Sequence, residues 1–104
     1  MRRIAVEDAL AETSVRRNAA RGVRALSFTE LPHELGLPSV HDRDGYWEPL
    51  WAECSDTGTV VCIHVGSSST LLTTSPDATI AVTTALSNIN AQRALADWLL
   101  SGVL

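Results

Sequence analysis

Two patterns of apolar and polar residues predict helices in the first half of the chain. An Ala- and Arg-rich segment predicts a helix over residues 6–21, with acidic residues in its first turn and Gly22 just past its end. Acids at the start and bases at the end suit the helix dipole. A second helix is predicted over 46–56, where Pro49 is tolerated in the first turn and Gly58 ends the helix. Its apolar stripe has the spacing i, i+3, i+4 and i+7, and consists of Trp47, Leu50, Trp51 and Cys54.

Two short segments have the pattern of strands. Val23–Phe28 follows the first helix after one glycine and predicts the first strand. Thr59–His64 is β-branched and apolar on both faces, which is typical of a strand covered on both sides in a parallel sheet. A long polar loop, Thr29–Gly45, separates the first strand from the second helix, and loops of this length are usually functional or disordered.

The last third of the chain predicts a further helix with a pause. Ser75 as N-cap followed by Pro76 predicts a helix start, so we expect a helix over 76–86. After a pause at 87–90, the helix is expected to resume over 91–100 and to stop at Gly102. The residues expected on its one apolar face are Ala91, Ala94, Leu95, Trp98 and Leu99.

The resulting order, α-β-α-β-α, predicts an α/β fold with parallel strands joined by right-handed crossovers. Chemistry in such folds lies at the carboxyl ends of the strands, which here are Phe28–Glu30 and His64–Gly66. Two parallel strands do not form a stable sheet by themselves, because their faces and edges both need cover. The pattern therefore points to a partner chain or to a larger domain.

Composition and charge exclude several classes of protein. The 104 residues carry a formal net charge of −4, and all eight basic residues are arginine, without a basic run, so nucleic-acid binding is not expected. Two cysteines are too few for a disulfide scaffold. The longest near-unbroken apolar stretch, Val60–Ile63, is too short to span a membrane. The N-terminal residues turn acidic at Glu7 and lack the apolar core of a signal peptide, so we expect a cytoplasmic protein.

His64 is the main candidate for chemistry. A neutral imidazole at the end of a strand is a natural ligand for zinc or iron, provided that its other nitrogen has a hydrogen-bond partner. The alternative is a partly buried histidine satisfied by a backbone carbonyl. Cys62 shares the face of His64 but is expected in the core. Gly66–Thr70 lacks the Gly-Lys-Ser/Thr ending of a phosphate-binding loop, which favours a turn that shapes a pocket.

Other polar residues have simpler interpretations. His33 and His41 lie in the long loop, where histidines are mostly solvated, although either could reach a site at the strand ends. Asp42 and Asp44 are expected to be turn or helix-cap residues. Glu30 could point over the sheet, but we expect a surface carboxylate.

Several strings that together cover nearly the whole chain carry a resemblance. They are RRNAARGVRA (16–25), LGLPSVHD (35–42) with YWEP (46–49), CIHVGSSS (62–69), TSPD (74–77) and ADWLLSGVL (96–104). Together they resemble the amidohydrolase-related family of metal-dependent hydrolases, in the branch that includes aminocarboxymuconate-semialdehyde decarboxylase. The chain looks like an actinobacterial-type member.

The resemblance implies a TIM-type (β/α)8 barrel, a fold of roughly 250 residues. Residues 1–104 would then be one partial domain, a middle slice of the barrel that holds strands four and five. His64 would be a ligand of a divalent metal, with zinc expected. The family's first-strand His-x-His pair, its sixth-strand histidine and its last-strand aspartate are absent here. Because a catalytic zinc needs about three protein ligands, we expect the metal to be bound in the intact parent enzyme. We expect the chain by itself neither to hold the metal nor to be active.

Two functional hypotheses follow. In the first, the chain is a fragment of a metal-dependent enzyme that hydrolyses or non-oxidatively decarboxylates a small organic substrate. In the second, it is a non-catalytic remnant or a half-barrel that associates with a second copy, since paired halves cover each other's edges. Neither hypothesis involves a nucleic acid or a membrane as a partner.

Overall fold

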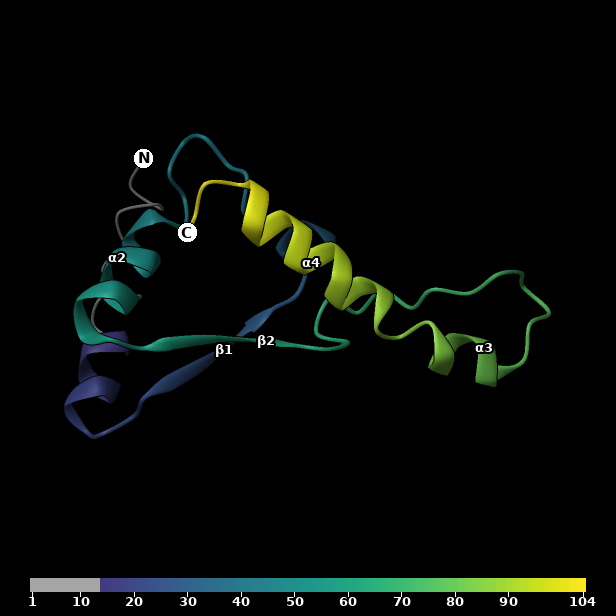
Figure 1. Ribbon diagram of the computed structural model, residues 1–104, viewed down its shortest axis with the longest axis horizontal. Helices are drawn as coiled ribbons and strands as arrows, with labels where there is room; N and C mark the ends of the chain where they lie inside the picture. Colours follow the sequence, from purple (N-terminus) through teal and green to yellow (C-terminus); the bar gives the residue numbers. More distant parts are fainter. Residues whose placement is uncertain (1–13) are drawn as a thin grey trace. The chain divides into compact units, whose positions relative to one another are not determined.

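The computed structural model describes residues 14–104 and has mixed helices and strands (Figure 1). Residues 14–20 are helical. They are followed by β1 (Ala25–Thr29), the 3-10 helix η1 (Pro32–Leu35), α2 (Glu48–Thr57), β2 (Val60–His64), α3 (Ile80–Ala85) and α4 (Ile89–Leu100). β1 and β2 form a parallel two-stranded sheet. This arrangement is compatible with the predicted α/β class, and residues 14–104 do not show a TIM-type barrel.

The chain divides into two compact units. The first contains the described residues 14–27 together with Asp42–Cys62, and the second contains Phe28–His41 together with Ile63–Leu104. Both strands contribute residues to each unit. The candidate chemistry at the carboxyl ends of the strands belongs to the second unit.

The first unit contains the two helices that the sequence predicted there. Residues 14–20 of the predicted helix 6–21 are helical, and its earlier part lies outside the described residues. Gly22 follows with φ 91°, a left-handed backbone that suits a helix stop. α2 has proline in its first turn and Gly58 as a left-handed C-cap, as predicted. Cys54 of its apolar stripe is buried.

The predicted helix start at Ser75 is wrong. The N–H group of Ala78 donates to the carbonyl oxygen of Ser75 (3.2 Å), so these residues form a single turn. Thr79 then takes an extended backbone conformation (φ −68°, ψ 157°), which interrupts helical hydrogen bonding, and α3 starts at Ile80. The segment from 65 to 79 therefore runs from β2 to α3 without a helix or a strand (Figure 1).

The core of the second unit is small and includes the start of the loop after β1. Phe28, Leu31, Val40 and Ala94 are buried. Trp98 of α4 packs on Phe28 edge to face, with ring centroids 6.0 Å apart. Trp98, which was expected on the apolar face of the last helix, thus contributes to packing within this unit.

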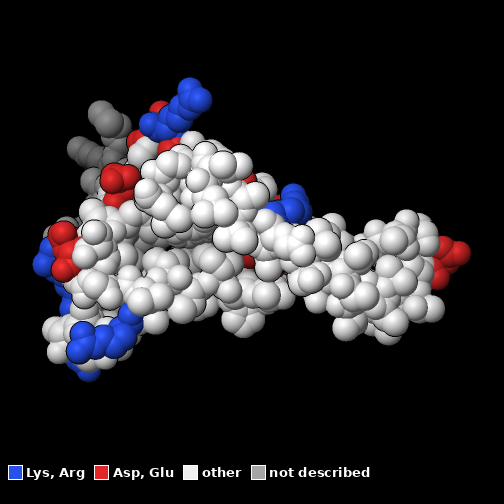
Figure 2. Space-filling view, viewed as in Figure 1, with Lys and Arg blue, Asp and Glu red and all other residues white. Residues whose placement is uncertain are grey.

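The predicted apolar face of the last helix is only partly buried. α4 turns Asn90 and Ala94 inward, while Leu95 and Leu99 are 59% and 60% exposed. Leu100 is 81% exposed. Figure 2 shows that the surface around α3 and α4 is mostly uncharged. The helix is apolar on two sides, and the described residues cover only one of them.

β2 departs from its prediction in the same way. Val60 and Cys62 are exposed, so the described residues do not cover the strand on both faces. The core position expected for Cys62 is wrong, because the face that it shares with His64 is open. No helix in residues 14–104 is long and apolar enough to cross a membrane.

Candidate functional site

The carboxyl ends of β1 and β2 bring Glu30 and the turn after His64 together within the second unit. The Glu30 side chain is 1% exposed, so the expectation of a surface carboxylate is wrong. Its Oε1 accepts a hydrogen bond from the N–H group of Gly66. Its Oε2 is buried and has no hydrogen-bond partner among the described residues. A carboxylate removed from water in this way is costly unless donors satisfy it, so its contact with Gly66 is a principal feature of the site.

Further hydrogen bonds join the end of β1 to the same turn. The Glu30 N–H group donates to Ser67 Oγ (2.9 Å), and Thr29 Oγ1 donates to the Ser67 carbonyl oxygen (3.1 Å). Ser67 Oγ donates in turn to the carbonyl oxygen of His64. These bonds fix the backbone of the turn from both of its ends.

The turn itself explains the need for glycine at position 66. The Ser67 N–H group lies 3.3 Å from the His64 carbonyl oxygen, which closes a four-residue turn. Gly66 occupies its third position with φ 84°, the left-handed value that a type II turn requires there. The interpretation of Gly66–Thr70 as a turn is confirmed, since a second turn follows with the Ser69 N–H group 3.3 Å from the Gly66 carbonyl oxygen.

The His64 ring is exposed and has one defined hydrogen bond. Its Nδ1 lies 2.7 Å from the carbonyl oxygen of Val65. Because a carbonyl oxygen only accepts, Nδ1 must carry the proton, and the neutral ring then has its lone pair on Nε2. This is the arrangement that metal-bound histidines adopt when a backbone carbonyl orients them. The backbone contact agrees with both interpretations of His64 from the sequence, but the partial burial expected in the alternative is wrong, because the residue is exposed.

The described residues do not supply a complete metal site. Within 14–104, no group of three or more His, Cys, Asp or Glu side chains is placed to hold a metal ion. Cys62 and Cys54 are both free thiols, the first exposed and the second buried. Burial, and secondarily the neighbouring Glu53 carboxylate, raises the pKa of the Cys54 thiol. His64 fits a metal ligand by its free Nε2, but it is a single ligand here.

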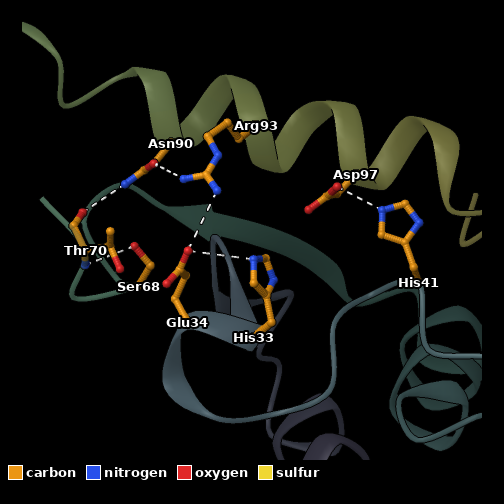
Figure 3. A network of polar contacts seen from close by, with 8 residues as sticks. All are labelled: His33, Glu34, His41, Ser68, Thr70, Asn90, Arg93 and Asp97. Atoms are coloured by element: carbon orange, nitrogen blue, oxygen red, sulfur yellow. Dashed lines mark hydrogen bonds and ion pairs between the residues drawn. The ribbon is translucent and has the colours of Figure 1, made fainter. Parts of the chain in front are cut away.

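A second polar cluster connects α4 with the loops of the same unit (Figure 3). Asn90 Nδ2 donates to the Thr70 carbonyl oxygen (2.9 Å), and Arg93 Nη1 donates to Asn90 Oδ1 (2.9 Å). Arg93 Nη2 lies 3.7 Å from Glu34 Oε1, which is also 3.8 Å from His33 Nε2. These contacts connect α4 with η1 and with the loop after β2.

The two loop histidines have different surroundings. His41 Nε2 lies 2.8 Å from Asp97 Oδ1 of α4, which gives it a defined partner (Figure 3). His33 has only the longer contact with Glu34. Neither His33 nor His41 shares a described hydrogen-bond partner with His64. Asp42 acts in a turn as predicted, since its Oδ2 accepts from the Tyr46 N–H group (3.0 Å).

Glu30 and Asn90 were the residues that sequence reasoning undervalued. Glu30 carried a usable signal, because it directly follows a strand whose carboxyl end was expected to carry chemistry. Asn90 lies four positions before the buried Ala94, and a polar residue at this spacing faces the same side of a helix. The amide therefore had to find a hydrogen-bond partner inside the unit.

Comparisons with known proteins leave the site to be interpreted from its geometry. In searches with protein-family models, among curated proteins and among solved structures, no match to this chain was found.

Proposed function

We propose that this chain is a segment of a metal-dependent, amidohydrolase-related enzyme that hydrolyses or non-oxidatively decarboxylates a small organic substrate. His64 supplies one ligand to a divalent metal, with zinc the expected ion. The segment corresponds to strands four and five of a TIM-type barrel, and the remaining ligands come from other parts of that barrel. The observation that carries the proposal is the exposed His64 residue, whose Nδ1–H is held by the Val65 carbonyl oxygen and whose Nε2 has no partner among residues 14–104.

Two further features support the proposal. The strands are parallel and lead at their carboxyl ends into polar loops, as in barrels whose active sites lie on that side. The outer leucines of α4 are exposed, as expected of a barrel helix that lacks its neighbours. Each feature is independent of the family resemblance in the sequence.

The chain's own residues would have limited, defined tasks. His64 holds the metal through Nε2, and its Nδ1 hydrogen bond fixes the ring plane. A bound zinc ion would supply an activated water, with a pKa near ~7, and polarise the substrate. The residues around the turn, Glu30 and Ser67, keep the His64 backbone in place through the bonds described above.

Zinc titration of the chain, followed through the NMR signals of its histidine rings, tests the ligand role. As a single ligand, His64 is expected to bind zinc weakly, but its signals are expected to shift at a lower zinc concentration than those of His33 and His41. The amount of zinc bound at that concentration is expected to fall in His64→Ala and to persist in the control His33→Ala. Both variants are compared in a Cys62→Ser background, because that exposed thiol could also bind zinc. His64 signals that stay unchanged while the other histidines respond would refute the proposal.

Sequencing the source locus tests the enzyme itself. An in-frame His-x-His pair upstream and an aspartate-bearing last strand downstream support a working barrel. A reading frame with no barrel sequence on either side refutes the enzyme proposal.

The outer side of α4 favours a second candidate, a non-catalytic module that pairs with a second copy of itself. Leu95, Leu99 and Leu100 are exposed and lie on one side of the helix. Gln92 and Ala96 lie among them, so that side carries no charge that would repel a second copy. A symmetric helix pair would cover the same residues on both chains.

Light scattering decides on this second candidate. A stable dimer supports it. A monomer at all concentrations, or only heterogeneous aggregate, refutes it.

A further inference from the structure

Glu30 and His64 lie on opposite sides of a single peptide group, the one that joins Val65 to Gly66. The N–H of this peptide donates to Glu30 Oε1, and its C=O accepts from His64 Nδ1 (2.7 Å). In a trans peptide these two bonds point in opposite directions. The Glu30 carboxylate and the His64 imidazole are therefore hydrogen-bonded to opposite edges of the same planar peptide group.

We propose that Glu30 is a positioning residue that sets the tautomer and orientation of His64 through this peptide. The relay consists of the Glu30 carboxylate, the Val65–Gly66 peptide and the His64 ring. It keeps the proton of the neutral ring on Nδ1 and leaves the lone pair on Nε2. The value of this state for metal binding rests on the proposed function, whereas the relay itself does not.

The turn type shows why a positioning group is needed. Type I and type II turns differ chiefly by a rotation of the middle peptide, and with glycine in the third position both are open to the chain. After such a rotation the Val65 carbonyl would no longer face the His64 ring, and the Gly66 N–H would no longer face Glu30. The buried Glu30 acceptor favours the orientation in which the carbonyl receives Nδ1–H.

Burial strengthens this preference. Glu30 is 1% exposed, so water does not compete freely for its oxygen. Hydrogen bonds that are shielded from water are stronger, and successive hydrogen bonds polarise each other. The bond from the Gly66 N–H group to Glu30 therefore makes the Val65 carbonyl a better acceptor for the imidazole proton.

The test measures the tautomer ratio of His64 by nitrogen NMR of ring-labelled chain, without metal, at a pH where the ring is neutral. We expect the Nδ1–H form to dominate in the unmodified chain. Glu30→Ala is expected to lower the ratio of Nδ1–H to Nε2–H by roughly three- to tenfold, the factor that one ordinary hydrogen bond is worth. Glu30→Gln keeps an acceptor oxygen and is expected to retain most of the ratio. Glu53→Gln, at another buried glutamate, is the matched control and is expected to leave the ratio unchanged.

Gly66→Ala provides an independent variant on the turn. A Cβ at this position would meet no atom within 4 Å, so the substitution acts only through the positive φ. It is expected to favour the rotated peptide and to lower the His64 ratio as Glu30→Ala does.

An unchanged ratio in Glu30→Ala, or an equal loss in Glu53→Gln, overturns the proposal. If Glu30→Ala does not fold, the unmodified chain decides through an NMR correlation across the hydrogen bond from the Gly66 nitrogen to the Glu30 carboxyl carbon. Its presence supports the relay, and its absence overturns it. Failure of the metal proposal has a different signature, in which zinc leaves His64 unaffected while its tautomer ratio is as expected.

Discussion

If the chain pairs with a second copy through α4, as the second candidate function proposes, replacing Leu95 and Leu99 by glutamine is expected to weaken that association by at least about a hundredfold. The two side chains are 59% and 60% exposed. Full burial of a leucine contributes about 1.5–3 kcal/mol, so the part still exposed can contribute about 1–2 kcal/mol for each residue. A symmetric dimer contains each leucine twice, which makes the hundredfold figure a lower bound.

The same substitutions are expected to leave the fold nearly unchanged. Both leucines are already largely in water, and surface substitutions of this kind change the free energy of unfolding by less than about 0.5 kcal/mol. Association and folding are therefore separated by one double variant. The control is Leu71→Gln, which removes a leucine that is 72% exposed but lies outside α4.

Sedimentation equilibrium over a dilution series measures the association constant of each variant. The reasoning is refuted if the double variant associates within threefold of the unmodified chain. It is also refuted if the control weakens association as strongly as the double variant does.

Three further predictions concern single residues. Leu31→Ala is expected to lower the free energy of unfolding by about 2–5 kcal/mol in denaturant titrations, because Leu31 is 1% exposed. A loss below about 1 kcal/mol would show that the loop after β1 is not part of the hydrophobic core. Cys54 is expected to react with a thiol reagent more slowly than Cys62 and to need higher pH. Burial raises the pKa of the Cys54 thiol, so its contribution to stability is present below the ordinary thiol range and is lost as the pH rises through the folded-state pKa. Equal rates at all pH values would contradict this. Ser75→Ala is expected to raise the pKa of Asp77 back toward its ordinary value in an NMR titration, because a hydrogen bond from Ser75 is the main cause that lowers it. An unchanged pKa in this variant would show that the hydrogen bond is not the cause.

Helix ends in this chain follow from local chemistry, and several of them could be predicted. Gly22, Gly58 and Gly102 all take left-handed backbone angles just beyond helical segments. Glycine adopts this conformation without a Cβ penalty, so the stop is encoded in the residue itself. Ser75 shows the limit of the method, because a good N-cap residue also suits an isolated turn, and the extended backbone of Thr79 decided between the two.

The sequence predicted which strand ends meet but not which side chains are buried there. The order of helices and strands placed the candidate residues at the carboxyl ends of β1 and β2, where His64 and Glu30 lie. The burial of Glu30 could not be read from the sequence, because a glutamate after a strand is exposed or buried according to what packs around it. Its contact with Gly66 crosses 36 positions of sequence.

The sequence by itself determined the alternating α/β order and the helix ends at glycines, because these depend on local backbone preferences and on the period of apolar residues. It also identified His64 as a candidate site residue, because this residue lies at the end of a predicted strand. Only the tertiary structure decided which apolar faces are covered. Leu95 and Cys62 have the pattern of core residues, yet both are exposed, since burial depends on neighbours that periodicity does not specify. The N–H group of the Val65–Gly66 peptide likewise gained Glu30 as its partner only when the carboxyl ends of the parallel strands met, whereas the contact of its carbonyl oxygen with His64 is local.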